Sequence, residues 1–382
     1  MKTETLVFIV LSYLFIILGY ILTPSINKNK PIKLQIKCVV YIIVFVLLCY
    51  SIRFIDLFYY RGLRFSNTIH QNRMLAIKGS HGVFLILASI FKTLFFVPLL
   101  LLLFQKITNK RLIIIAALLF ILPLVEAVLR GSRSPFLQTF VFFIIIVLIT
   151  NSIKFTKRNI LFFITAIGML FFISTKILMK REGPKNENPY KYLIEKAIYN
   201  DFLKPKEKIV RFMNNKEVPN SQKKMALSAL QIGQYYTHGV FEFDYVVKYY
   251  KQNKYKRQLG KYTFYVLPKF TNKYKISNVD LEKISKSAPR GYTFISFFGG
   301  MYIDFGWFSL LVMIALGAIQ KIVYNKVKQK QYYFAPILIF LLFTNFFMLT
   351  FNFFKGTGTY TLISCIIFAV LLSNLKYLKG NL

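Results

Sequence analysis

The sequence predicts an all-α polytopic membrane protein of about nine transmembrane helices with one long, mostly helical extracytoplasmic loop. Of its 382 residues, 55% are hydrophobic and the mean hydropathy is +0.49, which exceeds the usual values for a soluble domain. Apolar runs of about 18 or more residues recur, each long enough to cross roughly 30 Å of hydrocarbon as a helix. One stretch, 180–291, interrupts this pattern and holds ten of the 14 acidic residues. We interpret that stretch as the loop. Its middle part, 221–247, is expected to form an amphipathic helix, a glycine-bearing turn and a second helical or interfacial piece.

Six apolar runs precede the loop and three follow it. The first is too long for the apolar core of a signal peptide, and no small-residue cleavage site follows it, so we expect a retained helix. Residues 292–300 are expected to form either a loop or a re-entrant or broken segment, which leaves a total of ten to twelve helices open. The predicted spans are 5–23, 38–55, 83–104, 112–129, 135–151, 159–178, 302–324, 332–353 and 358–375. The predicted divisions are an N-terminal bundle (1–179), a loop module (180–291) and a C-terminal bundle (292–382).

Positive charge fixes the predicted orientation. Every second connection between spans is short, cationic and free of Asp and Glu, which by the positive-inside rule makes it cytoplasmic. The protein is therefore predicted to cross the membrane with its N-terminus outside and its C-terminus in the cytoplasm. The residues concerned are Lys28, Lys30, Lys33 and Lys37; Lys106, Lys110 and Arg111; Lys154, Lys157 and Arg158; Lys326, Lys328 and Lys330; and Lys376 and Lys379.

The net charge of +37 is explained by these connections and by the loop, where 24 Lys or Arg outnumber 10 Asp or Glu. Long loops are translocated largely regardless of charge. The lipid bilayer is thus an expected partner and nucleic acid is not. Cys38, Cys49 and Cys365 lie within predicted spans, and no Cys/His spacing indicates zinc. We expect neither a metal nor a cofactor.

Arginine gathers on the predicted outer face, whereas the cytoplasmic connections are mostly lysine. The turn RGSRSP, 130–135, places two arginines and a glycine between two spans. A guanidinium fork binds phosphate oxygens in pairs and keeps its charge, so this face suits an anionic lipid-linked substrate. Arg130 and Arg133 could equally extend to lipid headgroups. The arginines expected to bind diphosphate or substrate are Arg61, Arg64, Arg73, Arg130 and Arg290, with Gly131 admitting the backbone close to the ligand.

Titratable groups supply candidates for proton transfer. His238, in "YYTHGVF" of the loop, is a candidate general base, although an interfacial histidine with satisfied hydrogen bonds is the commoner case. Asp304, in "MYIDFGWF", lies beside an apolar run, where a carboxylate is costly unless it is paired. Arg290 could simply cap the return of the loop to the membrane. Glu126 and Lys92, inside two predicted spans, are interpreted as an internal ion pair or as side chains that extend to the interface.

Three short motifs together resemble the O-antigen polymerases, the Wzy-type oligosaccharide repeat unit polymerases. They are the RGSRSP turn, the tyrosine-rich "YYTHGVFEF" and "GGMYIDFGWFSLLVMIALG" where the loop returns. The matching residues are Gly131, Ser132 and Arg133; Tyr235, Tyr236, His238 and Gly239; and Tyr302, Asp304, Phe305, Gly306 and Gly317.

This resemblance implies a metal-independent, multi-pass glycosyltransferase of a bacterial cytoplasmic (inner) membrane. It would join undecaprenyl-diphosphate-linked oligosaccharide repeat units into an O-antigen or capsule at the outer face of the membrane, with undecaprenyl diphosphate as the leaving group. A flippase and a chain-length regulator would be its partners. His238, Arg133 and Asp304 are the expected catalytic residues, and Tyr235 and Tyr236 join the arginines as substrate-binding residues.

Other functions stay open at this point. A polysaccharide ligase would share the arginine-rich outer face. A repeat-unit flippase would need many polar groups within its spans. A polyprenyl-phosphate glycosyltransferase would be expected to carry an acidic pair in its first outer loop, where Asp56 is the one acid. A non-enzymatic membrane protein could bind acidic polysaccharide through the basic loop alone.

Overall fold

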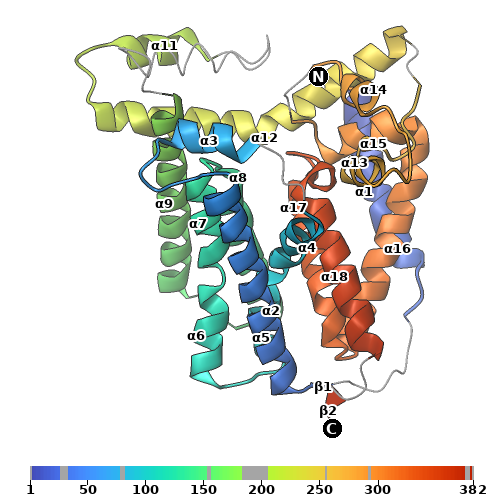
Figure 1. Ribbon diagram of the computed structural model, residues 1–382. Helices are drawn as coiled ribbons and strands as arrows, with labels where there is room; N and C mark the ends of the chain where they lie inside the picture. Colours follow the sequence, from blue (N-terminus) through green and yellow to red (C-terminus); the bar gives the residue numbers. More distant parts are fainter. Residues whose placement is uncertain are drawn as a thin grey trace. The chain divides into compact units, whose positions relative to one another are not determined.

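The computed structural model describes residues 2–25, 33–77, 82–152, 156–182, 205–253, 256–290, 294–374 and 379–380 (Figure 1). The chain divides into two compact units. Unit 1 comprises Met1–Gln35 with Tyr235–Leu382, and unit 2 comprises Ile36–Gln234. These boundaries differ from the predicted segments, because the first helix groups with the last ones and the loop module is shared between the two units. Each unit is described in turn.

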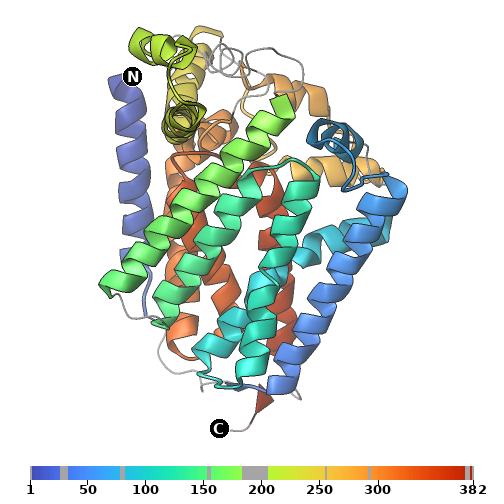
Figure 2. The same ribbon diagram turned by 90° about the vertical axis from the view of Figure 1, so that its left-hand side faces the viewer.

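Unit 2 contains most of the predicted N-terminal bundle. The helix α2 packs against α4 and α5, α7 packs against α8, and α8 packs against α9 (Figure 2). Its elements are α2 (Ile36–Ile55), a π-helical turn (Asp56–Tyr60), α3 (Ile69–Ile77), α4 (Val83–Phe91), a 3-10 turn (Lys92–Phe96), α5 (Val97–Phe104), α6 (Lys110–Leu118), α7 (Ile121–Leu129), α8 (Ser134–Thr150), α9 (Lys157–Glu182), α11 (Glu207–Asn214) and the first part of α12 (Asn220–Asn253).

Two of the predicted spans in unit 2 are interrupted helices, and proline explains both interruptions. Pro98 lies in the first turn of α5, directly after the 3-10 turn that ends α4. Pro123 lies in the first turn of α7, after the break that separates α6 from α7. Proline lacks the amide hydrogen that would continue the helical ladder, so the preceding turn tightens or breaks.

Unit 1 joins the two ends of the chain. In Figure 1, α12, α13 and α14 lie at the end of this unit where α1 begins, and α1, α16 and α18 finish at the opposite end. There β1 (Lys33–Leu34) pairs antiparallel with β2 (Lys379–Gly380), Lys33 opposite Gly380. The helices are α1 (Thr3–Leu22), the rest of α12, α13 (Val266–Lys273), α14 (Leu281–Lys286), α15 (Phe297–Phe305), α16 (Ser309–Lys328), α17 (Ala335–Phe347) and α18 (Thr357–Asn374).

Glycine allows α1 and α16 to pack backbone to backbone. A Cβ atom on Gly19 would lie 2.0 Å from the carbonyl oxygen of Ile314, and one on Gly317 would lie 1.9 Å from that of Ile16. Small residues at such crossings are typical of helix pairs in membranes, where van der Waals packing replaces the hydrophobic effect.

The glycine-bearing turn expected within 221–247 is wrong, because α12 is continuous from Asn220 to Asn253. Gly239 instead lies where α12 approaches another backbone: its Cβ would be 2.1 Å from the carbonyl oxygen of Thr350. Glycine inside a helix costs roughly 0.5–1 kcal/mol relative to alanine, and this contact accounts for its presence here. The sequence could not distinguish a glycine for a turn from a glycine for close packing.

The described helices confirm a helical membrane-type protein. Six segments in the described part of the chain are long and apolar enough to cross a membrane: Thr3–Leu22, Ile36–Tyr60, Val83–Phe104, Lys110–Leu129, Phe297–Lys328 and Thr357–Asn374. Ser134–Thr150 and Tyr332–Phe347 are apolar but shorter, and α9 covers the range predicted at 159–178. Side chains such as Leu14 and Ile21 are exposed on α1, as expected for a lipid-facing surface. The count of nine spans stays a prediction.

Candidate functional site

A group of ionised side chains in unit 2 includes Arg130, the first residue of the RGSRSP turn. It draws residues from α2, the π-helical turn, the segment after that turn, the 3-10 turn and α7. We call it the cationic cluster, and it comprises Arg53, Asp56, Arg61, Lys92, Glu126 and Arg130.

Glu126 is the first centre of the cluster. Its Oε1 accepts hydrogen bonds from Arg53 Nε at 3.0 Å and from Arg130 Nη1 at 3.3 Å. Its Oε2 pairs with the ammonium of Lys92. Of the two interpretations given for Lys92 and Glu126, the last contact confirms the internal ion pair.

Asp56 is the second centre. Its Oδ2 accepts from Arg53 Nη1 at 2.5 Å and from Arg61 Nε at 2.9 Å, and Arg61 Nη1 in turn donates to the Ala76 carbonyl at 2.6 Å. Asp56 and Arg61 are five residues apart. Side chains at this spacing point in different directions on an α-helix but lie on the same side of the π-helical turn found here. Arg53 bridges the two carboxylates.

The cluster holds an excess of positive charge. Four cations share two carboxylates, and the side chains of Arg53, Asp56 and Glu126 are no more than 8% exposed. Buried charge is costly unless it is matched. Burial and then the like charge of Arg53 lower the pKa of Arg61, against the opposing effect of Asp56. Within the described part of the chain, the buried Nε of Arg130 has no hydrogen-bond partner. The arrangement is suited to receiving an anion.

The RGSRSP turn closes α7 and opens α8. Gly131 N–H donates to the Val128 carbonyl and Ser132 N–H to the Ala127 carbonyl, a Schellman cap that needs a left-handed residue after the helix. Gly131 has φ +60°, and a Cβ there would lie 2.4 Å from Cγ2 of Ile69 on α3. Gly131 thus has a structural reason of its own, independent of a ligand.

The remaining arginines predicted in this unit lie differently. Arg133 is half-buried and precedes the first turn of α8. Arg64 and Arg73 are exposed. The backbone N–H of Arg64 donates to Asn72 Oδ1 at 3.1 Å. The described contacts therefore bring Arg61 and Arg130 into the cationic cluster and leave Arg64 and Arg73 outside it.

A second group of side chains lies in unit 1. On α12, Nδ1 of His238 lies 4.0 Å from Oε1 of Glu242, and the same oxygen accepts from Arg290 Nη1 at 3.3 Å. The Arg290 guanidinium stacks 4.0 Å from the ring centre of Tyr245. His238 and Glu242 are both buried. The structure thus brings the predicted residues His238 and Arg290 together through Glu242, which was not among the predicted site residues.

The electrostatics favour a neutral imidazole. Burial lowers the pKa of His238 below its ordinary value of 6.5; Glu242 opposes that shift and Arg290 adds to it. A histidine that is neutral at physiological pH can accept a proton. Of the two predicted tyrosines, Tyr236 is exposed enough to contact a ligand, and the side chain of Tyr235 lies outside the described residues.

Asp304 anchors a neighbouring loop. Its two carboxylate oxygens accept the backbone N–H groups of Tyr262, at 2.9 Å, and Thr263, at 2.8 Å, and the side chain is fully buried. The expectation that this acid needs partners is met by main-chain donors. Through these contacts the carboxylate holds the backbone at Tyr262 and Thr263 in place.

Arg257 and Lys355 complete the surroundings of Asp304. The Arg257 guanidinium lies between the rings of Tyr250 and Tyr302, 4.9 and 4.6 Å from their centres. Lys355 Nζ lies 3.6 Å from the ring centre of Tyr262, and burial lowers its pKa to about 8, against the opposing charge of Asp304. Lys355 was not singled out from the sequence because a lysine before a glycine in a short turn carries no motif.

Neither group forms a metal centre of the usual kind: among the described residues, no three His, Cys, Asp or Glu side chains gather to hold an ion. Arg133 and His238, both predicted to be catalytic, belong to different units. No family model matches the chain, and no curated protein or solved structure is significantly similar to it.

Proposed function

We propose that this protein is a multi-pass polymerase of a bacterial cytoplasmic membrane. It would join undecaprenyl-diphosphate-linked oligosaccharide repeat units into an O-antigen or capsular polysaccharide at the outer face. The observation that carries the proposal is the cationic cluster, where four cations share two carboxylates beside the RGSRSP turn. A diphosphate that leaves during glycosyl transfer needs such a site.

In this mechanism the cationic cluster binds the diphosphate of the lipid-linked donor. Arg130 is the cluster's most accessible member, with its side chain 39% exposed, and its buried Nε has no hydrogen-bond partner among the described residues. Arg133 on the far side of Gly131 would add a second guanidinium. Charge that develops on the leaving diphosphate would meet arginines held in place by Glu126 and Asp56.

The acceptor sugar would lose its hydroxyl proton to the second group. His238, neutral because it is buried, is the proposed proton acceptor, and Glu242 would stabilise the imidazolium that forms. Arg290 holds Glu242 in place and is a positioning residue. Asp304 likewise acts by positioning, through the loop it anchors.

The first experiment compares surface polysaccharide and extracted lipid-linked saccharides from a strain lacking the gene. Complementation uses wild type, Arg130→Lys, Arg133→Lys and the control Arg111→Lys. Arg111 is an exposed arginine of unit 2, in the first turn of α6. Lysine keeps the charge and loses the fork, so we expect shorter or absent polymer from the first two variants and normal polymer from the control. A deletion strain with an intact ladder would refute the proposal.

A flippase is the second candidate, and one observation favours it: Arg53, Lys92 and Glu126 lie within apolar helices, and ionised groups at such positions mark transport pathways. The same extracts separate the two functions. A polymerase mutant displays single repeat units at the surface, whereas a flippase mutant displays none and accumulates lipid-linked units on the cytoplasmic side. Full-length polymer retained on its lipid carrier would indicate a ligase.

A further inference from the structure

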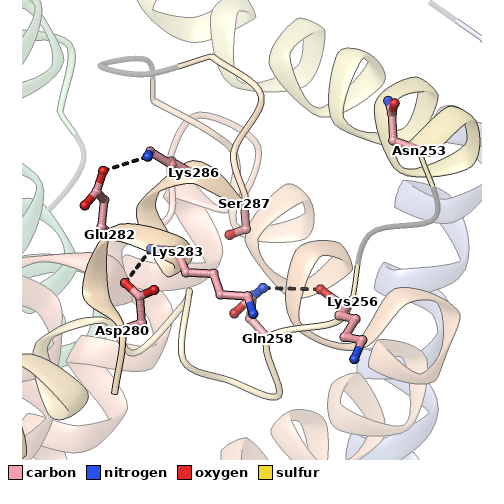
Figure 3. A pocket seen from close by; sticks show the side chains of 8 residues that line it. All are labelled: Asn253, Lys256, Gln258, Asp280, Glu282, Lys283, Lys286 and Ser287. Carbon is pink, nitrogen blue, oxygen red and sulfur yellow. Dashed lines mark hydrogen bonds and ion pairs between the residues drawn. The ribbon is translucent and has the colours of Figure 1, made fainter. Parts of the chain in front are cut away.

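An open pocket of about 430 Å³ lies in unit 1 between the end of α12 and α14. All eight side chains that line it are polar or charged, and the neighbouring turn and α14 supply most of them (Figure 3). Polar and charged side chains of this kind offer charge and hydrogen bonds to a hydrophilic ligand. None of the residues discussed above as catalytic lines this pocket.

The acidic residues of the pocket are already engaged. Glu282 Oε1 pairs with Lys286 Nζ at 2.6 Å. Asp280 Oδ1 accepts from the backbone N–H of Lys283 at 2.9 Å and thereby caps α14. Each carboxylate therefore has a local partner, and neither calls for a bound cation.

Two ammonium groups, by contrast, are uncommitted. Within the described residues, neither Lys256 Nζ nor Lys283 Nζ takes part in a hydrogen bond or ion pair, although the backbones of both residues do. Lys283 extends across the pocket toward Gln258, on the side away from Glu282 (Figure 3). The amide side chains of Asn253 and Gln258 also line the pocket. Together they offer charge for an anion and carbonyl oxygens for hydroxyl groups.

The pocket shares its supporting segments with the His238 group. α12 carries both His238 and Asn253, which are separated by roughly 22 Å at the helical rise of about 1.5 Å per residue. The segment after α14 carries Ser287 and Arg290, and the Tyr250 hydroxyl of α12 donates to the Ser287 carbonyl at 3.1 Å. A ligand reaching from His238 to this pocket would be longer than one sugar. The pocket would thus hold part of a saccharide remote from the reacting bond, where binding energy serves to orient the chain.

We propose that this pocket binds an acidic sugar, a residue bearing a carboxylate, in the saccharide chain that the protein extends. The link between this pocket and His238 rests on the proposed function. The binding site itself is inferred from the side chains that line the pocket. Lys256 and Lys283 hold the carboxylate, and the two amides bind neighbouring hydroxyls. Because both lysines are exposed, each contact contributes modestly and the site discriminates by charge.

The test measures binding to the purified full-length protein in nanodiscs. The probes are hexameric oligogalacturonate, neutral maltohexaose and inorganic phosphate. The pocket variant is Lys256→Gln/Lys283→Gln. The control variant, Lys248→Gln/Lys269→Gln, removes two exposed lysines of unit 1 that lie outside the pocket. Both variants change the net charge equally.

We expect oligogalacturonate to bind wild type and the control variant roughly tenfold more tightly than the pocket variant, as two lost surface ion pairs imply. Maltohexaose should bind all three proteins weakly and equally. Equal binding of oligogalacturonate to the two double variants would overturn the proposal, because it would mean attraction to the general basic surface. Equal affinity for phosphate and oligogalacturonate would also overturn it, because the site would then lack saccharide selectivity.

Complementation separates this inference from the proposed function. If the pocket variant loses oligogalacturonate binding while deletion of the gene leaves the polysaccharide ladder intact, the polymerase function fails and the pocket stands. If deletion abolishes the ladder while the pocket variant binds like the control, the function stands and the pocket assignment fails.

Discussion

Glu242 lies one helical turn beyond His238 on α12 and shares one carboxylate oxygen between the histidine and Arg290. Two opposite charges thereby act on one buried imidazole. Glu242 favours its protonated form and Arg290 opposes it, so the protonation of His238 is set by partners from two different segments.

The titration of His238 should respond to these partners with opposite signs. Glu242→Gln removes the charge that raises the pKa of His238, so this pKa should fall further below 6.5; Arg290→Gln should raise it toward 6.5. NMR of protein labelled at histidine Cε1 resolves three histidines, and loss of one signal in His238→Gln assigns the resonance. Shifts of the same sign in both variants would contradict the arrangement.

Loss of the Glu126 charge should destabilise the protein strongly. Glu126→Gln leaves Arg53 and Lys92 without their shared counter-ion, and breaking a buried pair costs about 3–5 kcal/mol. Thermal unfolding in detergent measures the effect as a lowered Tm. The control is Glu207→Gln on α11, whose ion pair with Arg211 is more than 80% exposed on both sides and should matter little. Equal Tm values for the two variants would show that the cluster carries no buried charge.

The α1–α16 crossing should not tolerate a methyl group. Gly19→Ala and Gly317→Ala each place Cβ within 2.0 Å of a backbone oxygen that has no side chain to move aside, and overpacking typically costs about 1–3 kcal/mol. Gly168→Ala on α9 is the control, because a Cβ there meets nothing within 4 Å. We expect a lower Tm for the first two variants and an unchanged or higher Tm for the control.

The anchoring role of Asp304 can be tested by the rate at which one peptide bond, between Lys261 and Tyr262, is cleaved. Trypsin cleaves after Lys261, and the amide of that bond is the Tyr262 N–H that Asp304 accepts. Asp304→Asn replaces one carboxylate oxygen, a hydrogen-bond acceptor, with an NH2 donor that faces a backbone N–H. The lost hydrogen bond costs about 1–3 kcal/mol, so trypsin should cleave the bond after Lys261 faster. Asp280→Asn retains a good helix cap and should cleave at the wild-type rate. Unchanged cleavage in Asp304→Asn would argue against the anchor.

The sequence predicted much of the architecture from local features. Each apolar run predicted as a span contains a helix, whereas the short helix α3 lies outside all of them. The Lys92–Glu126 pair was one of two expectations, because an unmatched charge inside an apolar run is costly. Gly239 was misread because glycine serves turns and close packing alike. Asp56 and Arg61 could not be paired, since their five-residue spacing meets on a π-helical turn that no sequence pattern announced.

By itself, then, the sequence determined the helical membrane class and the alternation of charge between connections. Both depend on how favourably individual residues partition between lipid and water. The tertiary structure alone decided which charges meet. Arg53, Glu126 and Lys92 come from three separate segments of unit 2, and Arg290 reaches Glu242 across 48 residues. Such contacts depend on how helices cross and in what register. Their packing is fixed by long-range side-chain fit that no local pattern encodes.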